Sequence, residues 1–190
     1  MKETTMSEQL IFRYEDCIQD RELAILINHI KKETKLNVPE NLAKYPWFDG
    51  DEIPFYKIAK SDSKVANAFA FCRDRITQMV AISYHEVVHS VYSDLVLWRP
   101  GRSQEEHTDD MNDDFRKYSA ILYLNEGYEG GETFINTPQG TYISKPKAGT
   151  VIVFTGDDRC KHGVNQVVSG NRMTMAMWFA DDIKHAEKYY

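Results

Sequence analysis

The chain has 190 residues, of which 42% are hydrophobic, 12% aromatic and 27% charged. This is the composition of a globular protein, so fibrous and disordered classes are excluded, and the length favours a single domain over residues 1–190. The formal net charge of −6 argues against nonspecific binding to nucleic acid or to an anionic membrane, both of which require a basic surface.

The first nine residues are polar and lack an apolar signal core, and no apolar run has the length of a membrane span. The three cysteines, Cys17, Cys72 and Cys160, are odd in number and show no Cys-x-x-Cys spacing. This pattern disfavours a disulfide framework and a zinc ribbon and fits a reducing compartment. We therefore expect a soluble protein of the cytoplasm.

The N-terminal part predicts support helices between about residues 20 and 89. A strand is expected at 10–14, and Asp20 is expected to cap a helix that ends near Lys35, with apolar positions at Leu23, Ala24, Ile27 and Ile30. A second helix is expected from a cap at Ser61 to about His89. Its apolar residues recur at spacings of three and four: Val65, Ala68, Phe69, Cys72, Ile76, Met79 and Val80.

The segment between these helices, about residues 37–56, contains three prolines and an Asp-Gly pair, which are typical of an irregular connector. Its aromatic side chains either line a pocket mouth or hold the connector against the protein body. The second interpretation is favoured for all four: Tyr45, Trp47, Phe48 and Phe55.

Residues His85-Glu86-Val87-Val88-His89 form a His-Glu-x-x-His sequence. In zinc peptidases, two such histidines share a helix face and bind the metal, and the glutamate acts as general base. The following segment, Val91–Trp98, alternates like a strand and offers no third ligand on a helix. A zinc peptidase is therefore a minor alternative, and these residues are better explained as polar positions near a helix end.

From about residue 91 to 181 the chain changes to short β-type segments separated by turn residues. Strands are expected at 91–98, 105–109, 118–125, 131–136, 141–145, 149–155, 160–168 and 172–180, with a closing helix at 181–188. About eight such strands favour a jelly roll of the cupin kind. The predicted fold class is thus α+β, mainly β, with N-terminal support helices before a double-sheet core.

Candidate metal ligands occur within this β-rich part. In an extended segment, His107 and Asp109 project from the same face, so an imidazole nitrogen and a carboxylate oxygen converge. This supplies two of the three ligands of a 2-His-1-carboxylate site, which holds Fe(II) and leaves positions open. His162 is the candidate third ligand. Arg172, on the last strand, calls for an anionic partner if buried, and Tyr123 could add a hydroxyl donor to that anion.

Taken in order, these residues resemble the prolyl-hydroxylase branch of the 2-oxoglutarate/Fe(II) dioxygenases, as in prolyl 4-hydroxylase alpha-subunit and prolyl 3-hydroxylase catalytic domains. The resemblance covers residues 90–181 and implies a double-stranded β-helix. It rests on His107-x-Asp109, Ser119-Ala-Ile-Leu-Tyr-Leu-Asn, Glu129-Gly-Gly-Glu-Thr-Phe, His162-Gly-Val and Arg172. Arginine rather than lysine at position 172 is closer to the prolyl 3-hydroxylase, oxygen-sensing and lysyl hydroxylase branches.

The resemblance implies a role for each of these residues. His107, Asp109 and His162 would bind iron, and Arg172 would pair with the distal carboxylate of 2-oxoglutarate. Tyr123 would donate to that carboxylate, and Trp178 would lie beside the cosubstrate. One departure is Trp98, which falls where many relatives carry a pocket tyrosine.

The implied reaction hydroxylates a prolyl residue in a peptide or protein and converts 2-oxoglutarate to succinate and CO2, with Fe(II), O2 and ascorbate required. The same chemistry on a lysyl residue, a free amino acid or another small molecule is an alternative. A non-catalytic jelly-roll binding module is a minor one, because decayed members usually lose a ligand. The acidic run at 109–114 is better explained as a solvated loop than as a lid for a basic partner.

Overall fold

The computed structural model describes residues 9–34, 51–110 and 115–187. Its strands follow the predicted order. The predicted strand 131–136 is found as β7, the predicted strand 160–168 is divided into β10 and β11, and the short strands β2 and β6 were not predicted. The strands are β1 Ile11–Tyr14, β2 Asp51–Pro54, β3 His89–Trp98, β4 Gln104–His107, β5 Tyr118–Tyr123, β6 Glu129–Gly130, β7 Thr133–Thr137, β8 Gly140–Ser144, β9 Val151–Thr155, β10 Lys161–Val164, β11 Val167–Ser169 and β12 Arg172–Ala180.

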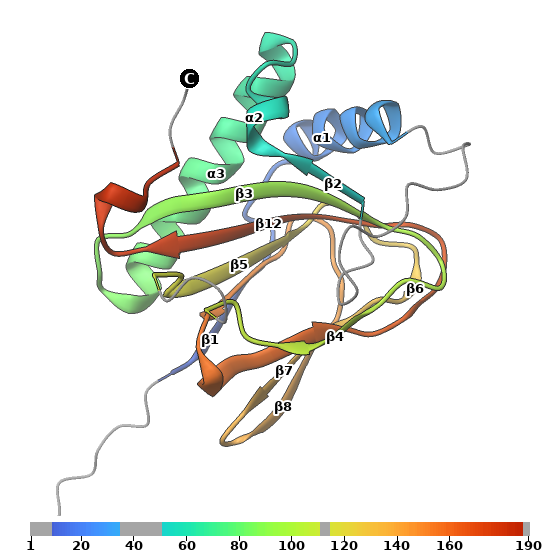
Figure 1. The fold of residues 1–190 in the computed structure, drawn as a ribbon. Helices are drawn as coiled ribbons and strands as arrows, with labels where there is room; N and C mark the ends of the chain where they lie inside the picture. The colour runs from blue at the N-terminus through green and yellow to red at the C-terminus, as the bar shows by residue number, and fades with distance from the viewer. Residues whose placement is uncertain (1–8, 35–50, 111–114, 188–190) are drawn as a thin grey trace, which may run out of the picture.

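Two sheets face each other, as the turn spacing predicts for a jelly roll (Figure 1). The larger sheet has the order β1-β9-β5-β12-β3-β2, and the smaller has the order β4-β10-β7-β8. A short additional sheet pairs β11 with β6. Alternate side chains of each strand point into the space between the sheets or away from it, and this alternation places the site residues described below.

The helices are α1 Asp20–Glu33, α2 Phe55–Ile58 and α3 Ser63–Tyr84. The two long helices cover the outer face of the larger sheet (Figure 1). All seven apolar residues that the spacing predicts for α3 are buried, as expected of a helix that packs one face on a sheet. The predicted face of α1 is partly wrong, because Leu26 is buried whereas Ala24 is exposed.

Several predicted helix ends are wrong. Gln19 is the N-cap of α1, so Asp20 is its first helical residue. Asp62, not Ser61, caps α3: its carboxylate accepts the backbone N–H groups of Lys64 and Val65. The helix ends at Tyr84, and no closing α-helix follows β12, since 181–187 contains only a 3-10 turn at Ile183–His185. The predicted end of α1 at Lys35 lies outside the described residues.

The connector before α3 is more regular than its prolines suggest, because residues 51–54 form β2 on the edge of the larger sheet and Pro54 ends that strand. Phe55 is buried and stacks on Phe69 with ring centroids 5.8 Å apart, as expected of an aromatic residue that holds the connector against the body. The other three aromatic residues of the connector, Tyr45, Trp47 and Phe48, lie outside the described residues.

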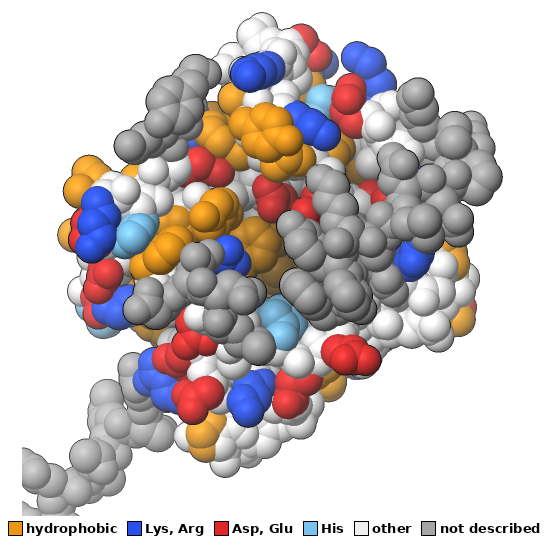
Figure 2. Space-filling view, in the orientation of Figure 1, with side chains coloured by type: hydrophobic (Ala, Val, Ile, Leu, Met, Phe, Trp, Pro, Cys, Tyr) orange, Lys and Arg blue, Asp and Glu red, His pale blue; other side chains and the backbone are white. Residues whose placement is uncertain are grey.

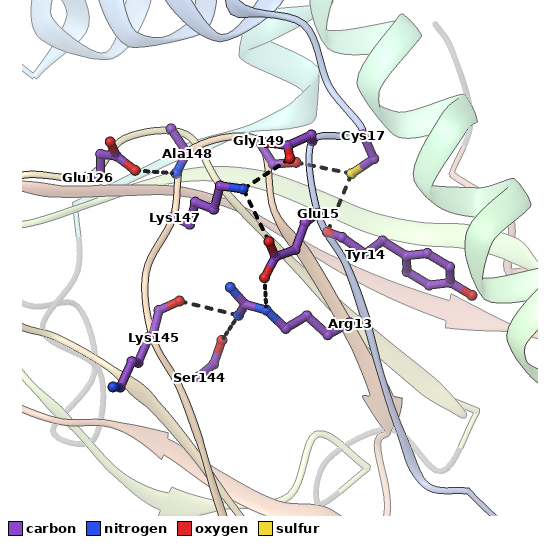
Figure 3. Close-up of polar contacts among 11 residues, drawn as sticks. Arg13, Tyr14, Glu15, Cys17, Glu126, Ser144, Lys145, Lys147, Ala148 and Gly149 are labelled. Carbon is purple, nitrogen blue, oxygen red and sulfur yellow. Dashed lines mark hydrogen bonds and ion pairs between the residues drawn. The ribbon is translucent and has the colours of Figure 1, made fainter.

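Polar side chains hold β1 against the segment that leads into β9 (Figure 3). Arg13 Nη1 donates to Ser144 Oγ over 3.1 Å. Lys147 Nζ lies 3.1 Å from a carboxylate oxygen of Glu15 and 3.0 Å from one of Asp16. Each of these surface contacts contributes little to the free energy of unfolding. None of the helices in the described ranges combines the length and the apolar character needed to cross a bilayer.

Candidate active site

Three side chains with metal-ligand chemistry converge between the sheets. His107 ends β4, Asp109 lies two residues beyond it, and His162 on β10 pairs with His107 in the antiparallel register. Asp109 Oδ1 is 3.6 Å from His107 Nε2, and Asp109 Oδ2 is 3.3 Å from His162 Nε2. Within the described ranges, no other group of histidine, cysteine and carboxylate side chains meets in this way. The structure therefore brings together the three residues singled out in the sequence, and their binding of iron remains a prediction.

The backbone determines which nitrogen of each imidazole faces Asp109. Nδ1 of His107 lies 3.0 Å from the Glu105 carbonyl oxygen, and Nδ1 of His162 lies 3.0 Å from that of Cys160. Because a carbonyl oxygen only accepts, Nδ1 of each neutral ring carries the proton. Each Nε2 then carries a lone pair that could bind a metal, which is the arrangement that orients histidine ligands in metal sites; Nε2 of His107 also lies 3.3 Å from Nε2 of Gln104.

The larger sheet holds Asp109 in place. Ser119 Oγ on β5 donates to Asp109 Oδ2 over 2.5 Å, and the backbone N–H of Asp109 donates to the Gly156 carbonyl over 2.9 Å. A β-carbon at Gly156 would lie 2.6 Å from the Arg116 carbonyl oxygen, so only glycine allows this close approach. The carboxylate is thus fixed from one sheet while the histidines come from the other.

The electrostatics of these residues suit a divalent cation. Burial raises the pKa of Asp109, but the charges and hydrogen bonds of the two histidines outweigh burial and hold that pKa well below its usual range. Burial lowers the pKa of His107, but the hydrogen bond and charge of Asp109 outweigh it and raise that pKa. An ionised carboxylate beside two imidazoles is the donor set of non-haem Fe(II) sites, so the residues present fit this ion.

The candidate ligands line one side of a cavity of about 350 Å³ between the sheets. Its opening appears in Figure 2 as a hollow with a histidine at its rim. Along its floor, alternate residues of β3 and β12 face each other in register: Trp98 with Arg172, Val96 with Thr174, Asp94 with Ala176 and Tyr92 with Trp178. The two strands therefore form a continuous surface from the Arg172 end to the Trp178 end.

The guanidinium of Arg172 is buried at one end of this cavity, with only 1% of the residue exposed. Its Nη2 donates to Thr133 Oγ1 over 3.1 Å, whereas its Nε has no hydrogen-bond partner and no described carboxylate forms an ion pair with it. Its charge lies between the rings of Trp98 and Tyr123, 5.4 and 5.5 Å from their centroids. A buried cation in this state calls for an anionic ligand, and a carboxylate fits the planar fork.

Thr133 on β7 stands between Arg172 and Tyr123. Its Oγ1 accepts from Arg172 and also from the Tyr123 hydroxyl, over 2.9 Å. A hydroxyl that accepts twice keeps its own proton to donate, and Thr133 lines the cavity. Thr133 can therefore present a donor to an anion beside Arg172. Direct donation by Tyr123 to the cosubstrate remains a prediction. The contact of Trp178 with the cosubstrate also remains a prediction, and Trp178 lies six residues, about 20 Å, along β12 from Arg172.

Several cavity residues were not singled out in the sequence. Ser119 and Thr133 belong to motifs that the sequence analysis quoted, Ser119-Ala-Ile-Leu-Tyr-Leu-Asn and Glu129-Gly-Gly-Glu-Thr-Phe, but their roles in the site were not predicted. Nothing in the sequence around Asp94 and Arg116 predicts that they line the cavity, because their position depends on which strands pair. The Arg116 guanidinium lies 4.7 Å from the ring centroid of Tyr92 and 5.7 Å from that of Trp178.

The zinc-peptidase alternative is wrong. His85 is the left-handed C-cap of α3, with φ of 54°, and His89 is the first residue of β3. The two histidines therefore do not share a helix face, which that alternative requires. Glu86 instead accepts hydrogen bonds from Lys117 Nζ and from the Tyr118 hydroxyl, each over 2.9 Å. The motif joins the end of α3 to β5.

The sequence of residues 90–180 matches the family model of the 2OG-Fe(II) oxygenase superfamily. This segment of the chain belongs to that superfamily. Fe(II), 2-oxoglutarate and O2 are the cofactor and cosubstrates that membership implies. The oxygenase is 30% identical to prolyl 3-hydroxylase 2 of Rattus norvegicus over 148 residues, which are 70% of this chain and 21% of that protein. It is 39% identical to prolyl 3-hydroxylase 1 of Gallus gallus over 77 residues, which are 39% of this chain and 11% of that protein.

The oxygenase thus spans about a fifth of the length of the rat relative. Among solved structures, it is similar to a Pseudomonas putida prolyl-4-hydroxylase, with a TM-score of 0.72 and 19% identity over 90% of this chain and 92% of that one. A Trichoplax adhaerens prolyl hydroxylase in complex with a hypoxia inducible factor peptide gives a TM-score of 0.73 and 14% identity, over 92% and 84% of the two chains. These similarities establish the double-stranded β-helix fold.

Proposed function

We propose that this oxygenase hydroxylates a prolyl residue in a peptide or protein and converts 2-oxoglutarate to succinate and CO2. One observation carries the proposal: the three candidate ligands, His107, Asp109 and His162, face the same cavity as Arg172, whose charge no described carboxylate neutralises. The similarity to proteins named prolyl 3-hydroxylase supports a prolyl target.

When bound, Fe(II) together with 2-oxoglutarate and O2 supplies the oxidising chemistry that turns a C–H bond into C–OH. The two histidines and Asp109 would hold the metal from one side and leave its other positions facing the cavity. Arg172 would pair with the distal carboxylate of the cosubstrate, and the Thr133 hydroxyl would donate to the same group. These residues act by orientation, which keeps the cosubstrate in place while the target residue approaches.

Ascorbate, as a reductant that maintains ferrous iron, and a cytoplasmic location are parts of the same proposal. The location is supported by the cysteines, since Cys17, Cys72 and Cys160 are all free thiols. Free thiols are usual in a reducing compartment.

The test is succinate formation from 2-oxoglutarate by the Fe(II)-loaded protein with proline-containing peptides. Wild type should form succinate and add one oxygen atom to proline, as mass spectrometry would detect. Asp109→Ala should lose both, whereas Asp110→Ala, which removes a neighbouring carboxylate outside the triad, should retain both. Equal turnover by wild type and Asp109→Ala would refute the proposal. If metal analysis finds no iron bound at a stoichiometric level, the alternative of a non-catalytic jelly-roll binding module would be favoured instead.

A further inference from the structure

The side chain of Trp98 lies at the Arg172 end of the cavity. Trp98 is the last residue of β3 and pairs with Arg172, the first residue of β12, so the two side chains lie next to each other on the cavity floor. The carbon at the centre of the guanidinium is 5.4 Å from the centroid of the Trp98 ring. The indole therefore fills the space beside the cation that would hold an anionic ligand.

Apolar side chains from both sheets pack with this indole. Trp98 is 3% exposed and belongs to a buried cluster with Val96 and Ala176 of the larger sheet, Val164 on β10 and Val167 on β11. β10 belongs to the smaller sheet, and Val164 lines the cavity together with Trp98. The cluster thus joins the two sheets and forms the wall of the cavity at this end.

Backbone hydrogen bonds hold this wall in place. Just after β3, the N–H of Gly101 donates to the Val167 carbonyl over 2.8 Å, and the N–H of Val167 donates to the Arg102 carbonyl over 2.9 Å. The chain is therefore paired with β12 at Trp98 and tied to β11 a few residues later. A closely packed side chain on a backbone held in this way cannot turn aside to admit a larger ligand without losing contacts.

The guanidinium of Arg172 is held as firmly as the wall. A β-carbon on Gly131 would lie 3.0 Å from Arg172 Cδ, so the stem of the arginine packs directly on this glycine. At the other end of the side chain, Nη2 donates to Thr133 Oγ1 over 3.1 Å, and the central carbon lies 5.5 Å from the centroid of the Tyr123 ring. The fold therefore sets the distance between this cation and the candidate metal ligands.

A ligand that bridges the metal and Arg172 must have the length that this distance allows. We propose that Trp98 selects the chain length of that ligand, a 2-oxo dicarboxylate, by filling the space that a longer one would need. The inference rests on the proposed function, because it takes Arg172 as the partner of the distal carboxylate. Its test measures binding, so its outcome can be separated from that of the hydroxylation test.

Isothermal titration calorimetry of the Fe(II)-loaded protein, without oxygen, would compare 2-oxoglutarate with two related acids. 2-Oxoadipate is one methylene longer, and 2-oxovalerate has the same carbon chain but lacks the distal carboxylate. Wild type should bind 2-oxoglutarate at least about tenfold more tightly than 2-oxoadipate, since one methylene in a closely packed site is worth about tenfold or more. It should also bind 2-oxovalerate at least about tenfold more weakly, because that ligand leaves the buried Arg172 without a carboxylate.

Trp98→Phe keeps an aromatic ring beside Arg172 but removes the extra volume of the indole. It should reduce the preference for 2-oxoglutarate over 2-oxoadipate to about threefold or less, and leave the preference over 2-oxovalerate unchanged because the cation remains. Trp98→Tyr is a second variant and should act in the same direction. Tyr92→Leu is the matched control: it removes an aromatic ring from the opposite end of the same cavity, six residues or about 20 Å along β3, and should leave both preferences as in wild type.

Equal binding of 2-oxoglutarate and 2-oxoadipate by wild type would overturn the inference. So would an unchanged preference in Trp98→Phe and Trp98→Tyr, or a loss of preference of the same size in Tyr92→Leu, which would show a general loosening of the cavity. If the preference shifts as expected but no proline peptide gains oxygen, the proposed function fails and this inference stands. If proline is hydroxylated but the Trp98 variants keep the wild-type preference, only the proposed function stands.

Discussion

Replacing Asp94, a carboxylate on β3 that lines the cavity, with asparagine tests whether this carboxylate is held there at a cost in folding stability. The side chain of asparagine has nearly the same shape but cannot ionise. The pKa of Asp94 is raised from an ordinary value of 3.8 to about 7, chiefly by burial. Each pKa unit corresponds to about 1.4 kcal/mol, so a shift of about three units amounts to about 4 kcal/mol. This is an upper limit, because Asp94 is only partly buried and local rearrangement reduces the cost of burying a charge.

The sign follows from proton binding. Because the pKa is higher in the folded state, the folded protein holds this proton more tightly between about pH 4 and pH 7. The free energy of unfolding therefore falls as the pH rises through that range, and the full penalty is present above pH 7. Asp94→Asn should be more stable than wild type at pH 8, by up to about 4 kcal/mol, and nearly equal to it at pH 4.

The measurement is urea unfolding of the metal-free protein at several pH values, followed by tryptophan fluorescence. Glu187, whose pKa burial also raises, contributes a slope of the same sign to both proteins, so the difference between them isolates Asp94. Glu33→Gln is the control and should follow the wild-type curve. Parallel curves for wild type and Asp94→Asn at all pH values would refute this account.

Three further predictions concern the rest of the site. Ser119→Ala removes the hydroxyl that orients the carboxylate ligand, so Fe(II) affinity measured by competition should fall by about 10- to 100-fold; an unchanged affinity would contradict the assigned role. Thr133→Val removes the hydroxyl beside the buried guanidinium and should raise the KM for 2-oxoglutarate about tenfold with kcat little changed, since a lost hydrogen bond to a charged group weakens binding. An unchanged KM in steady-state kinetics would show that this hydroxyl does not contact the cosubstrate. His85→Ala and His89→Ala should each keep bound metal by elemental analysis, whereas His107→Ala should lose it, and the reverse result would revive the zinc-peptidase alternative.

Local periodicity was enough to predict the elements with strong patterns. The apolar residues of α3 recur at three and four, and all of them are buried. The spacing of His107 and Asp109 is enough to place both on one face of an extended chain. Order along the chain and resemblance then pointed to His162 and Arg172 without any knowledge of strand pairing.

The features that the sequence did not reveal depend on long-range register. Asp94 and Glu52 are 42 positions apart and meet only because β2 pairs with β3. Nothing local shows that Thr133 accepts the Tyr123 hydroxyl. The helix caps were misplaced by one residue. At α3, Ser61 and Asp62 are both able to accept backbone N–H groups and local sequence alone does not decide between them, whereas the N-cap of α1, Gln19, makes no side-chain cap hydrogen bond at all.

The strand β12 carries both ends of the cavity on one face, with Arg172 at its start and Trp178 six residues later, while Met173 and Met175 pack toward the helices. Inserting one residue directly after Arg172 would turn every later side chain of β12 to the opposite face. The methionines would then enter the cavity and the tryptophan would leave it. An insertion in the exposed turn between β7 and β8 would leave both faces intact. Homologues of this chain are therefore expected to vary in length at that turn and to keep β12 at constant length.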